Sequence, residues 1–212
     1  MYTPEHFEEH DKENKFALMR SNPLATLVTL GTDGLNANHI PLLLVESPNT
    51  LGTLKGHIPR VNPLASGTPD DGEALAIFHG PSGYISPSWY ASKREHGKVV
   101  PTWNYAVVHA YGKLRVVDDI VWVKSQIEEL TTANESQFAN PWKVSDAPSD
   151  YTGRLLRGLV GIELEISRLI GKNKASQNQP ASNRAGVIEG LLSLNSSESD
   201  ALAALVGDPG LD

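Results

Sequence analysis

The chain has 212 residues, of which 40% are apolar and 20% charged, with a formal net charge of -7. These apolar and charged fractions are those of an ordinary globular protein. The negative net charge argues against a general nucleic-acid-binding surface. The absence of cysteine excludes disulfides, thiolate metal sites and cysteine nucleophiles. Residues 1–15 lack a signal-peptide pattern and no apolar run approaches the ~18 residues of a membrane span, so we expect a soluble cytoplasmic protein without membrane contact.

The first third of the chain predicts one helix followed by several strands. Pro4 is typical of a helix start, and this helix is expected to end near Pro23. His6 and His10 lie four residues apart within it, but zinc proteases place Glu directly after the first histidine and Phe7 stands there, so we assign no metal ligand. The strands expected next lie at residues 25–30, 35–45, 51–57 and 74–79, with a hairpin turn at 31–34.

The motif GHIPRVNP, residues 56–63, directly follows one of these strands. Glycine permits a close approach of the backbone, Arg60 offers a bidentate donor fork, and a helical turn near 62–65 would add free amides. Together these groups suit a phosphate. A surface turn with an exposed arginine is the alternative interpretation.

An aromatic-rich stretch, residues 80–112, contains two of the four Trp and four of the six Tyr of the chain. Its middle part, residues 86–98, is too polar for a core strand and too long for a tight hairpin. Aromatic and hydroxyl groups beside a basic loop are typical of the mouth of a ligand site. Ordinary packing of an aromatic hairpin against a sheet would give the same pattern.

The rest of the chain is expected to alternate strands and helices. Asp118 and Asp119 predict the start of a helix that runs through Leu130. Alternating apolar residues predict strands at 106–117 and 160–169, the second followed by a polar stretch at 171–178. Short helices are expected at 151–159 and 183–192, and an acidic, Ser-rich tail, mobile or weakly helical, at 193–212.

About six or seven strands with few long helices between them favour an antiparallel barrel over a doubly wound sheet. The sequence has no GxGxxG between a strand and a helix, no GxxxxGK[ST] and no GxSxG, so it offers neither a nucleotide-phosphate loop nor a nucleophile elbow. Ser86 and Ser88 with His96 or His109 would supply the residue types of a hydrolase triad, but nothing fixes their geometry. We therefore assign no catalytic residue.

Several motifs occur along the chain in the order NPLATLVTL, ANHIPLLL, GTLKGHIPRVNP, GPSGYISPSWYASKREHGKVVPTWNYAVVHAYG, PWKVSDAP, VGIELEI and GKNKASQN. In this order and spacing they resemble the PaiB family of FMN-binding negative transcriptional regulators, within the FMN-binding split-barrel superfamily. The resemblance covers roughly residues 1–192. It implies one mainly β domain with flanking helices, folded as a six-stranded antiparallel split barrel, and a homodimer with FMN at each side of the dimer interface. Residues 193–212 would form the acidic, mobile C-terminal tail.

The motifs and the resemblance together give nine candidate FMN-binding residues: His57, Arg60, Asn62, Trp103, Asn104, Tyr105, Lys172, Lys174 and Gln177. The first three would hold the phosphate and ribityl end, because an arginine fork binds a dianion and His and Asn satisfy hydroxyls. The middle three would cover the flavin ring and read its pyrimidine edge. The last three would reach the phosphate, from either subunit, or form a solvent-facing basic turn instead. Packing against the dimer partner is the alternative for Trp103. Candidates for a lid are Tyr84, Ser86, Ser88 and Trp89.

Two main functional hypotheses remain open at this stage. The resemblance implies a flavin-binding homodimer that represses transcription, whereas the alternative is an FMN-dependent oxidoreductase in which the flavin transfers electrons to or from a small substrate. Haem handling through a histidine ligand is a third hypothesis. Direct DNA contact is possible but is not supported by the net charge, because Lys93, Arg94 and Lys98 form the only comparable basic patch outside the expected site.

Overall fold

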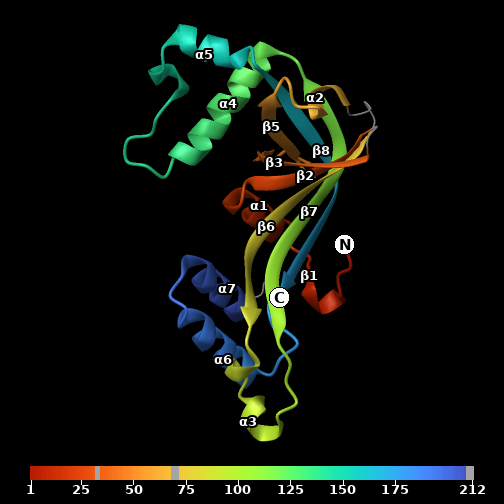
Figure 1. The fold of residues 1–212 in the computed structure, drawn as a ribbon, viewed down its shortest axis with the longest axis vertical. Helices are drawn as coiled ribbons and strands as arrows, with labels where there is room; N and C mark the ends of the chain where they lie inside the picture. The colour runs from red at the N-terminus through yellow and green to blue at the C-terminus, as the bar shows by residue number, and fades with distance from the viewer. Residues whose placement is uncertain (32–33, 68–71, 209–212) are drawn as a thin grey trace. The chain divides into compact units, whose positions relative to one another are not determined.

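An eight-stranded, mainly antiparallel sheet with flanking helices is the framework of the protein in a computed structural model, which describes residues 1–31, 34–67 and 72–208 (Figure 1). The strands are β1 Glu8–Glu9, β2 Leu24–Gly31, β3 Gly34–Pro41, β4 Leu43–Val45, β5 Thr53–Pro59, β6 Glu73–Ile85, β7 Thr102–Val117 and β8 Leu159–Lys174. Neighbouring strands follow the order β3-β2-β6-β7-β8-β5-β4, and β1 pairs with β8.

The helices are short, except for one that is about four turns long. They are α1 Lys12–Ser21, α2 Leu64–Gly67, α3 Ser92–His96, α4 Ile120–Glu135, α5 Ser149–Leu156, α6 Ala181–Leu192 and α7 Ser197–Gly207, with 3₁₀ turns η1 Glu5–Phe7, η2 Pro87–Trp89 and η3 Val144–Asp146. Among the described residues no helix is long and apolar enough to span a membrane.

The predicted antiparallel sheet class is confirmed, but the expected number of six strands is too low, because the sheet also contains the two short strands β1 and β4. Strands β2, β3, β5, β6, β7 and β8 each have at least seven residues, whereas β1 has two and β4 has three. β4 is separate from β3 because Pro41 cannot donate a ladder hydrogen bond. The next amide, of Leu42, donates instead to the carbonyl of Pro23 at 2.9 Å.

The last strand is longer than the sequence predicts. The polar stretch after Leu169 was expected to leave the sheet, but β8 continues to Lys174. Its extra residues find a ladder partner in β1, where Glu8 is paired with Lys172 and Glu9 with Gly171. A partner more than 160 residues away along the chain leaves no local signal, and the prediction of a turn was therefore wrong here.

The expected single domain, residues 1–192, is divided in the structure into two compact units. Unit 1 consists of Met1–Asn22, Phe78–His109 and Ile170–Asp212, and unit 2 of Pro23–Ile77 and Ala110–Leu169. The long strands β6, β7 and β8 each contribute residues to both units.

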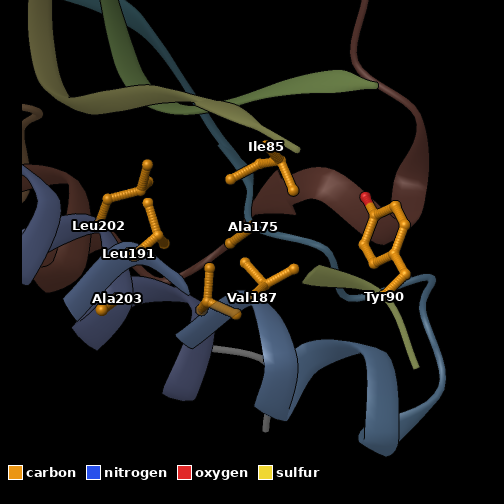
Figure 2. Close-up of a cluster of buried hydrophobic side chains, with 8 residues drawn as sticks. Ile85, Tyr90, Ala175, Val187, Leu191, Leu202 and Ala203 are labelled. Atoms are coloured by element: carbon orange, nitrogen blue, oxygen red, sulfur yellow. The ribbon is translucent and has the colours of Figure 1, made fainter. Parts of the chain in front are cut away.

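The tail after residue 192 was expected to be mobile or weakly helical, and it contains a helix in the structure. Residues 197–207 form helix α7, which begins with a capping box between Ser196 and Ser199. Apolar residues on one face of α7, among them Leu202 and Val206, are buried in a cluster with Ile85 of β6 and residues of α6 (Figure 2). The tail is acidic overall, but the spacing of its apolar residues matches one face of a helix. Residues 209–212 lie outside the described part.

The first helix begins later than the sequence predicts, and the fourth begins where expected. Pro4 precedes only the turn η1, and α1 starts at Lys12 after Asp11, whose carboxylate accepts from the amide of Asn14 at 2.9 Å. The predicted cap of α4 is confirmed, because Asp119 accepts from the amides of residues 121 and 122 at 2.8 and 3.3 Å. The predicted hairpin at 31–34 includes residues 32–33, which lie outside the described residues, but its flanking strands pair in register from Gly31–Gly34 to Leu24–Pro41.

Candidate functional site

His57 lies on the face of β5 that helix α4 covers, in unit 2. Side chains alternate along this strand, and Leu54 and Ile58 are buried on its other face. The Nδ1 atom of His57 lies 2.8 Å from Oε1 of Gln126, on α4. Gln126 is 1% exposed, and its Nε2 has no hydrogen-bond partner within the described part of the chain. One ring nitrogen of His57 is therefore held by α4.

Arg60 follows β5 directly, and its guanidinium is paired with Asp118. Its Nη1 and Nη2 atoms donate to the two carboxylate oxygens, each at 2.7 Å, and it also donates to the carbonyls of Arg157 and Leu159 at 3.2 and 3.3 Å. Hydrogen bonding to Arg60 lowers the pKa of Asp118, and the same bonds raise the pKa of Arg60. Both side chains are largely exposed to solvent. A phosphate would have to replace Asp118 on this fork, and exposed ion pairs exchange readily.

Asn62, the third predicted residue of this motif, lies at the turn into α2. Its Nδ2 donates to Oδ1 of Asn38, on β3, at 2.9 Å, and its Oδ1 accepts from the amide of Leu64 at 2.9 Å. Asn62 therefore starts the helical turn that the sequence predicts after the motif, and it ties this turn to the edge strand.

Lys172 lies in β8, in unit 1, with its ammonium between two tyrosine rings. Its Nζ atom is 5.3 Å from the ring centroid of Tyr105 and 6.0 Å from that of Tyr2, and it donates to the carbonyl of Tyr2 at 3.1 Å. The residue is only 8% exposed, and the two rings favour a cation at this place. The structure thus brings Lys172 and Tyr105 together, and the N-terminal segment covers the cation.

Lys174 and Asn104 connect β8 and the chain after it to the start of β7. Lys174 donates from Nζ to Oγ1 of Thr102 at 2.5 Å and to the carbonyl of Trp103 at 2.9 Å. Asn104 is buried, and its Nδ2 donates to Oγ of Ser176 at 2.8 Å. Five of the residues predicted from two distant motifs therefore lie on adjacent strands of unit 1: Trp103, Asn104, Tyr105, Lys172 and Lys174.

Gln177 closes the turn that follows β8. Its Oε1 accepts from the amide of Ala175 at 2.7 Å, and its Nε2 donates to the carbonyl of Asn173 at 2.5 Å. Between them Ser176 adopts a left-handed conformation with φ of 62°. The Gln177 amide therefore stabilises an irregular piece of backbone, whatever ligand it also contacts.

The aromatic stretch divides into an exposed part and a packed part. Trp103 is 53% exposed, and its ring meets that of Tyr84 edge to face, with centroids 6.4 Å apart. Trp89, predicted as a lid residue, instead lies against α6, where Gly186 and Gly190 leave room for it. Tyr84 and Trp103 are therefore accessible to a ligand or a partner, whereas Trp89 is part of the core of unit 1.

The nine predicted residues form two groups, one in each unit. His57, Arg60 and Asn62 belong to unit 2, and the other six to unit 1. Taken separately, Arg60 in unit 2 and Lys172 with Lys174 in unit 1 are residue types that suit a phosphate dianion, and unit 1 adds exposed aromatic surface and amides of the kind that suit a ring system and its polar edge. The buried, unpaired Nε2 of Gln126 beside His57 is a further donor in the first group.

Sequence reasoning missed the residues that orient the predicted ones. Asp118 was expected only at a helix start, and Gln126, Asn38 and Ser176 were not considered. Each orients a residue far away in the sequence, so no short motif contains the pair. One signal was present for Gln126, because it is a polar residue on the apolar face of a helix, four positions after Trp122.

The sheet, its flanking helices and its structural neighbours define the fold class, an antiparallel split β-barrel. One neighbour is the FAD and heme binding protein from Mycobacterium smegmatis, with a TM-score of 0.59 and 15% identity, covering 79% of this chain and 73% of that one. Another is a conserved hypothetical protein from Mycobacterium tuberculosis, with a TM-score of 0.58 and 11% identity, covering 85% of this chain and 94% of that one. At these identities the likeness shows the fold alone.

Residues 1–168 match the family described as "Putative FMN-binding domain", and the chain belongs to this family. The protease synthase and sporulation protein PAI 2 of Bacillus subtilis is 30% identical, with 98% of this chain and 97% of that protein covered. An uncharacterized protein of Emericella nidulans is 35% identical, with 91% of each chain covered. The resemblance to PaiB proteins and the expected cofactor, FMN, are thereby confirmed.

Proposed function

We propose that this protein is an FMN-binding homodimer that acts as a negative transcriptional regulator of the PaiB type. The observation that carries the proposal is the 30% identity to PAI 2 of Bacillus subtilis along 98% of this chain. The name of that relative refers to protease synthesis and sporulation, processes that a regulator controls. Membership of the FMN-binding family supports flavin as the ligand through which regulation acts.

The proposal assigns flavin contacts to each group of residues separately. In unit 2, Arg60 would supply positive charge to a phosphate, and in unit 1 Lys172 and Lys174 would do so while Trp103 with Tyr105 would cover a flavin ring. Bound FMN would supply reversible electron transfer, while this chain binds and orients it. In a homodimer each group can be supplied by either subunit.

Regulation would not depend on broad contact with DNA. The formal net charge of -7 disfavours a surface that neutralises many phosphates. The regulator would therefore act through a protein partner or through the redox state of its flavin. FMN-dependent oxidoreductase activity is the competing outcome of the tests below.

The first test is the absorbance spectrum of the freshly purified protein, with mass spectrometry of what denaturation releases. The expected result is a flavin spectrum and the mass of FMN, and sedimentation should give a dimer. In Arg60→Ala, FMN affinity should fall by about tenfold to a hundredfold, because a charged donor is lost. Arg154→Ala, in an exposed ion pair on α5, is the matched control and should bind FMN normally. A colourless protein that binds no added FMN would refute the proposal.

The second test separates regulator from enzyme. Bleaching of the flavin by a nicotinamide donor, followed by reoxidation in air with turnover of a small substrate, would favour the oxidoreductase. If the protein is a regulator, deletion of its own gene should instead change transcription from a reporter. DNA retention that disappears at about 150 mM salt would agree with indirect regulation, whereas sequence-specific retention at that salt would not.

A further inference from the structure

We infer that Gln126 is a positioning residue that fixes the tautomer of His57, so that His57 presents a hydrogen-bond acceptor, at Nε2, to its ligand. The inference rests on the proposed function in one respect, because it takes His57 to belong to the flavin site. It refines the role expected for His57, which was to satisfy hydroxyls of the ligand, by making the ring an acceptor for such a hydroxyl.

The first step is the position of the two side chains. Along α4, Trp122 and Gln126 are four residues apart and therefore lie on the same face of the helix. On the sheet below, His57 of β5 is paired directly with Gly161 of β8. Trp122 lies over the glycine, where any Cβ would overlap its ring, and Gln126 lies over the histidine, 2.8 Å from Nδ1. The two helix residues, one turn apart, therefore each contact one member of the cross-strand pair formed by His57 and Gly161.

The second step is the rigidity of this arrangement. The Trp122 indole donates from Nε1 to Oε1 of Glu163 at 3.2 Å, which fixes the ring over β8. Lys55, two residues before His57 on the same face of β5, lies 5.9 Å from the same ring and 3.8 Å from Glu129 of α4. The helix is therefore held to the sheet on both sides of Gln126, and the amide has little room to move at 1% exposure.

The third step is the chemistry of the imidazole. Because Oε1 of Gln126 can only accept, Nδ1 of His57 must carry the hydrogen. In a neutral imidazole the other nitrogen then has a lone pair. No group in the described part of the chain bonds to this Nε2. A lone pair repels a phosphate oxygen and accepts from a hydroxyl, so the ligand group that His57 recognises is an alcohol such as a ribityl hydroxyl.

The orientation of the Gln126 amide decides which ring nitrogen of His57 carries the hydrogen. Turned by 180°, the amide would donate from Nε2 to Nδ1, and His57 would become a donor at its own Nε2. The tautomer of His57 is therefore the quantity to measure. ¹⁵N chemical shifts of the imidazole distinguish the two forms in the wild-type protein, with no variant needed.

The wild-type protein should show the Nδ1–H tautomer of His57, assigned by loss of its signals in His57→Gln. Gln126→Leu should shift the ring toward the Nε2–H form and weaken FMN binding by about tenfold. Gln126→Glu, which still accepts from Nδ1, should keep the hydrogen on that nitrogen. Ser125→Ala, on the exposed side of α4, is the matched control.

Two results would overturn the inference: an Nε2–H tautomer in the wild-type protein, or an unchanged tautomer in Gln126→Leu. A change of tautomer without any change in FMN affinity would show that Gln126 orients His57 but that His57 does not contact the ligand, which also contradicts it. Failure of the proposed function is distinguishable, because it appears as absence of FMN binding by the wild-type protein, whereas the tautomer is measured without ligand.

Discussion

The carboxylate of Asp118 accepts two hydrogen bonds of 2.7 Å from the guanidinium of Arg60, across 58 residues of sequence. This is the geometry in which an arginine fork also binds a phosphate. Asp118 therefore stands in the place of an anionic ligand, and the two would compete for Arg60.

Asp118→Asn should strengthen the binding of FMN by roughly twofold to fivefold, because the phosphate no longer has to displace a carboxylate. The measurement is a titration of the apoprotein with FMN, in which binding is monitored through the quenching of flavin fluorescence. Riboflavin has no phosphate, and its affinity should stay the same. Equal gains for FMN and riboflavin would show that Asp118 acts on the site in another way.

Gly190→Ala should destabilise the protein although alanine is the better helix former. An added Cβ at position 190 would overlap the Trp89 indole, and overpacking of this kind costs about 1–3 kcal/mol. Gly153→Ala is the matched control, because its Cβ would meet only Nη1 of Arg157 at 4.0 Å, and it should stabilise by about 0.5–1 kcal/mol. The free energies of unfolding of both variants, measured by urea titration, are compared with that of the wild-type protein. A neutral Gly190→Ala would mean that Trp89 can move aside.

Leu202→Ala should lower the free energy of unfolding by about 2–5 kcal/mol, because the side chain is fully buried between α7, α6 and β6. Leu194 is 57% exposed in the connection before α7, and Leu194→Ala should change stability by less than about 0.5 kcal/mol. Chemical denaturation compares the two. If both variants changed the free energy of unfolding by a similarly small amount, the result would support a mobile tail instead.

His109 should make stability depend on pH. Burial lowers the pKa of His109 below its ordinary 6.5, and repulsion from the N-terminal ammonium and from His79 lowers it further. Below about pH 6.5 the unfolded chain binds a proton that the folded protein does not, so the free energy of unfolding falls with falling pH and levels off below the folded-state pKa.

His109→Gln should flatten this part of the curve, measured by denaturation at about pH 7.5, 6.5 and 5.5. His10→Gln, at an exposed position, is the control. A wild-type protein whose stability is constant across this range would contradict the account of His109.

Local chemistry made much of the sheet predictable from the sequence. Alternating or β-branched runs located the long strands, and Asp119 located the start of α4. The end of β8 could not be predicted, because Lys172 is kept in the ladder by Glu8 from the other end of the chain. The burial of helix α7 was not predicted for a similar reason, since its apolar face gains a partner only when Ile85 of β6 is placed against it.

The residue types of the candidate site were easier to predict than their orientation. Arg60 and Lys172 stand in recognisable motifs, but the groups that hold them, Asp118 and the ring of Tyr105, depend on the fold. His57 shows the same limit, because the polarity of its ring is set by a glutamine 69 residues away.

The division of the chain between the two units also affects its synthesis. Every segment of unit 2 has left the ribosome once residue 169 has emerged, whereas unit 1 needs the segment that begins at Ile170. Unit 2 can therefore fold during translation, while Met1–Asn22 waits for its partner strand to be made. Until then β1 in this first segment lacks the strand with which it pairs.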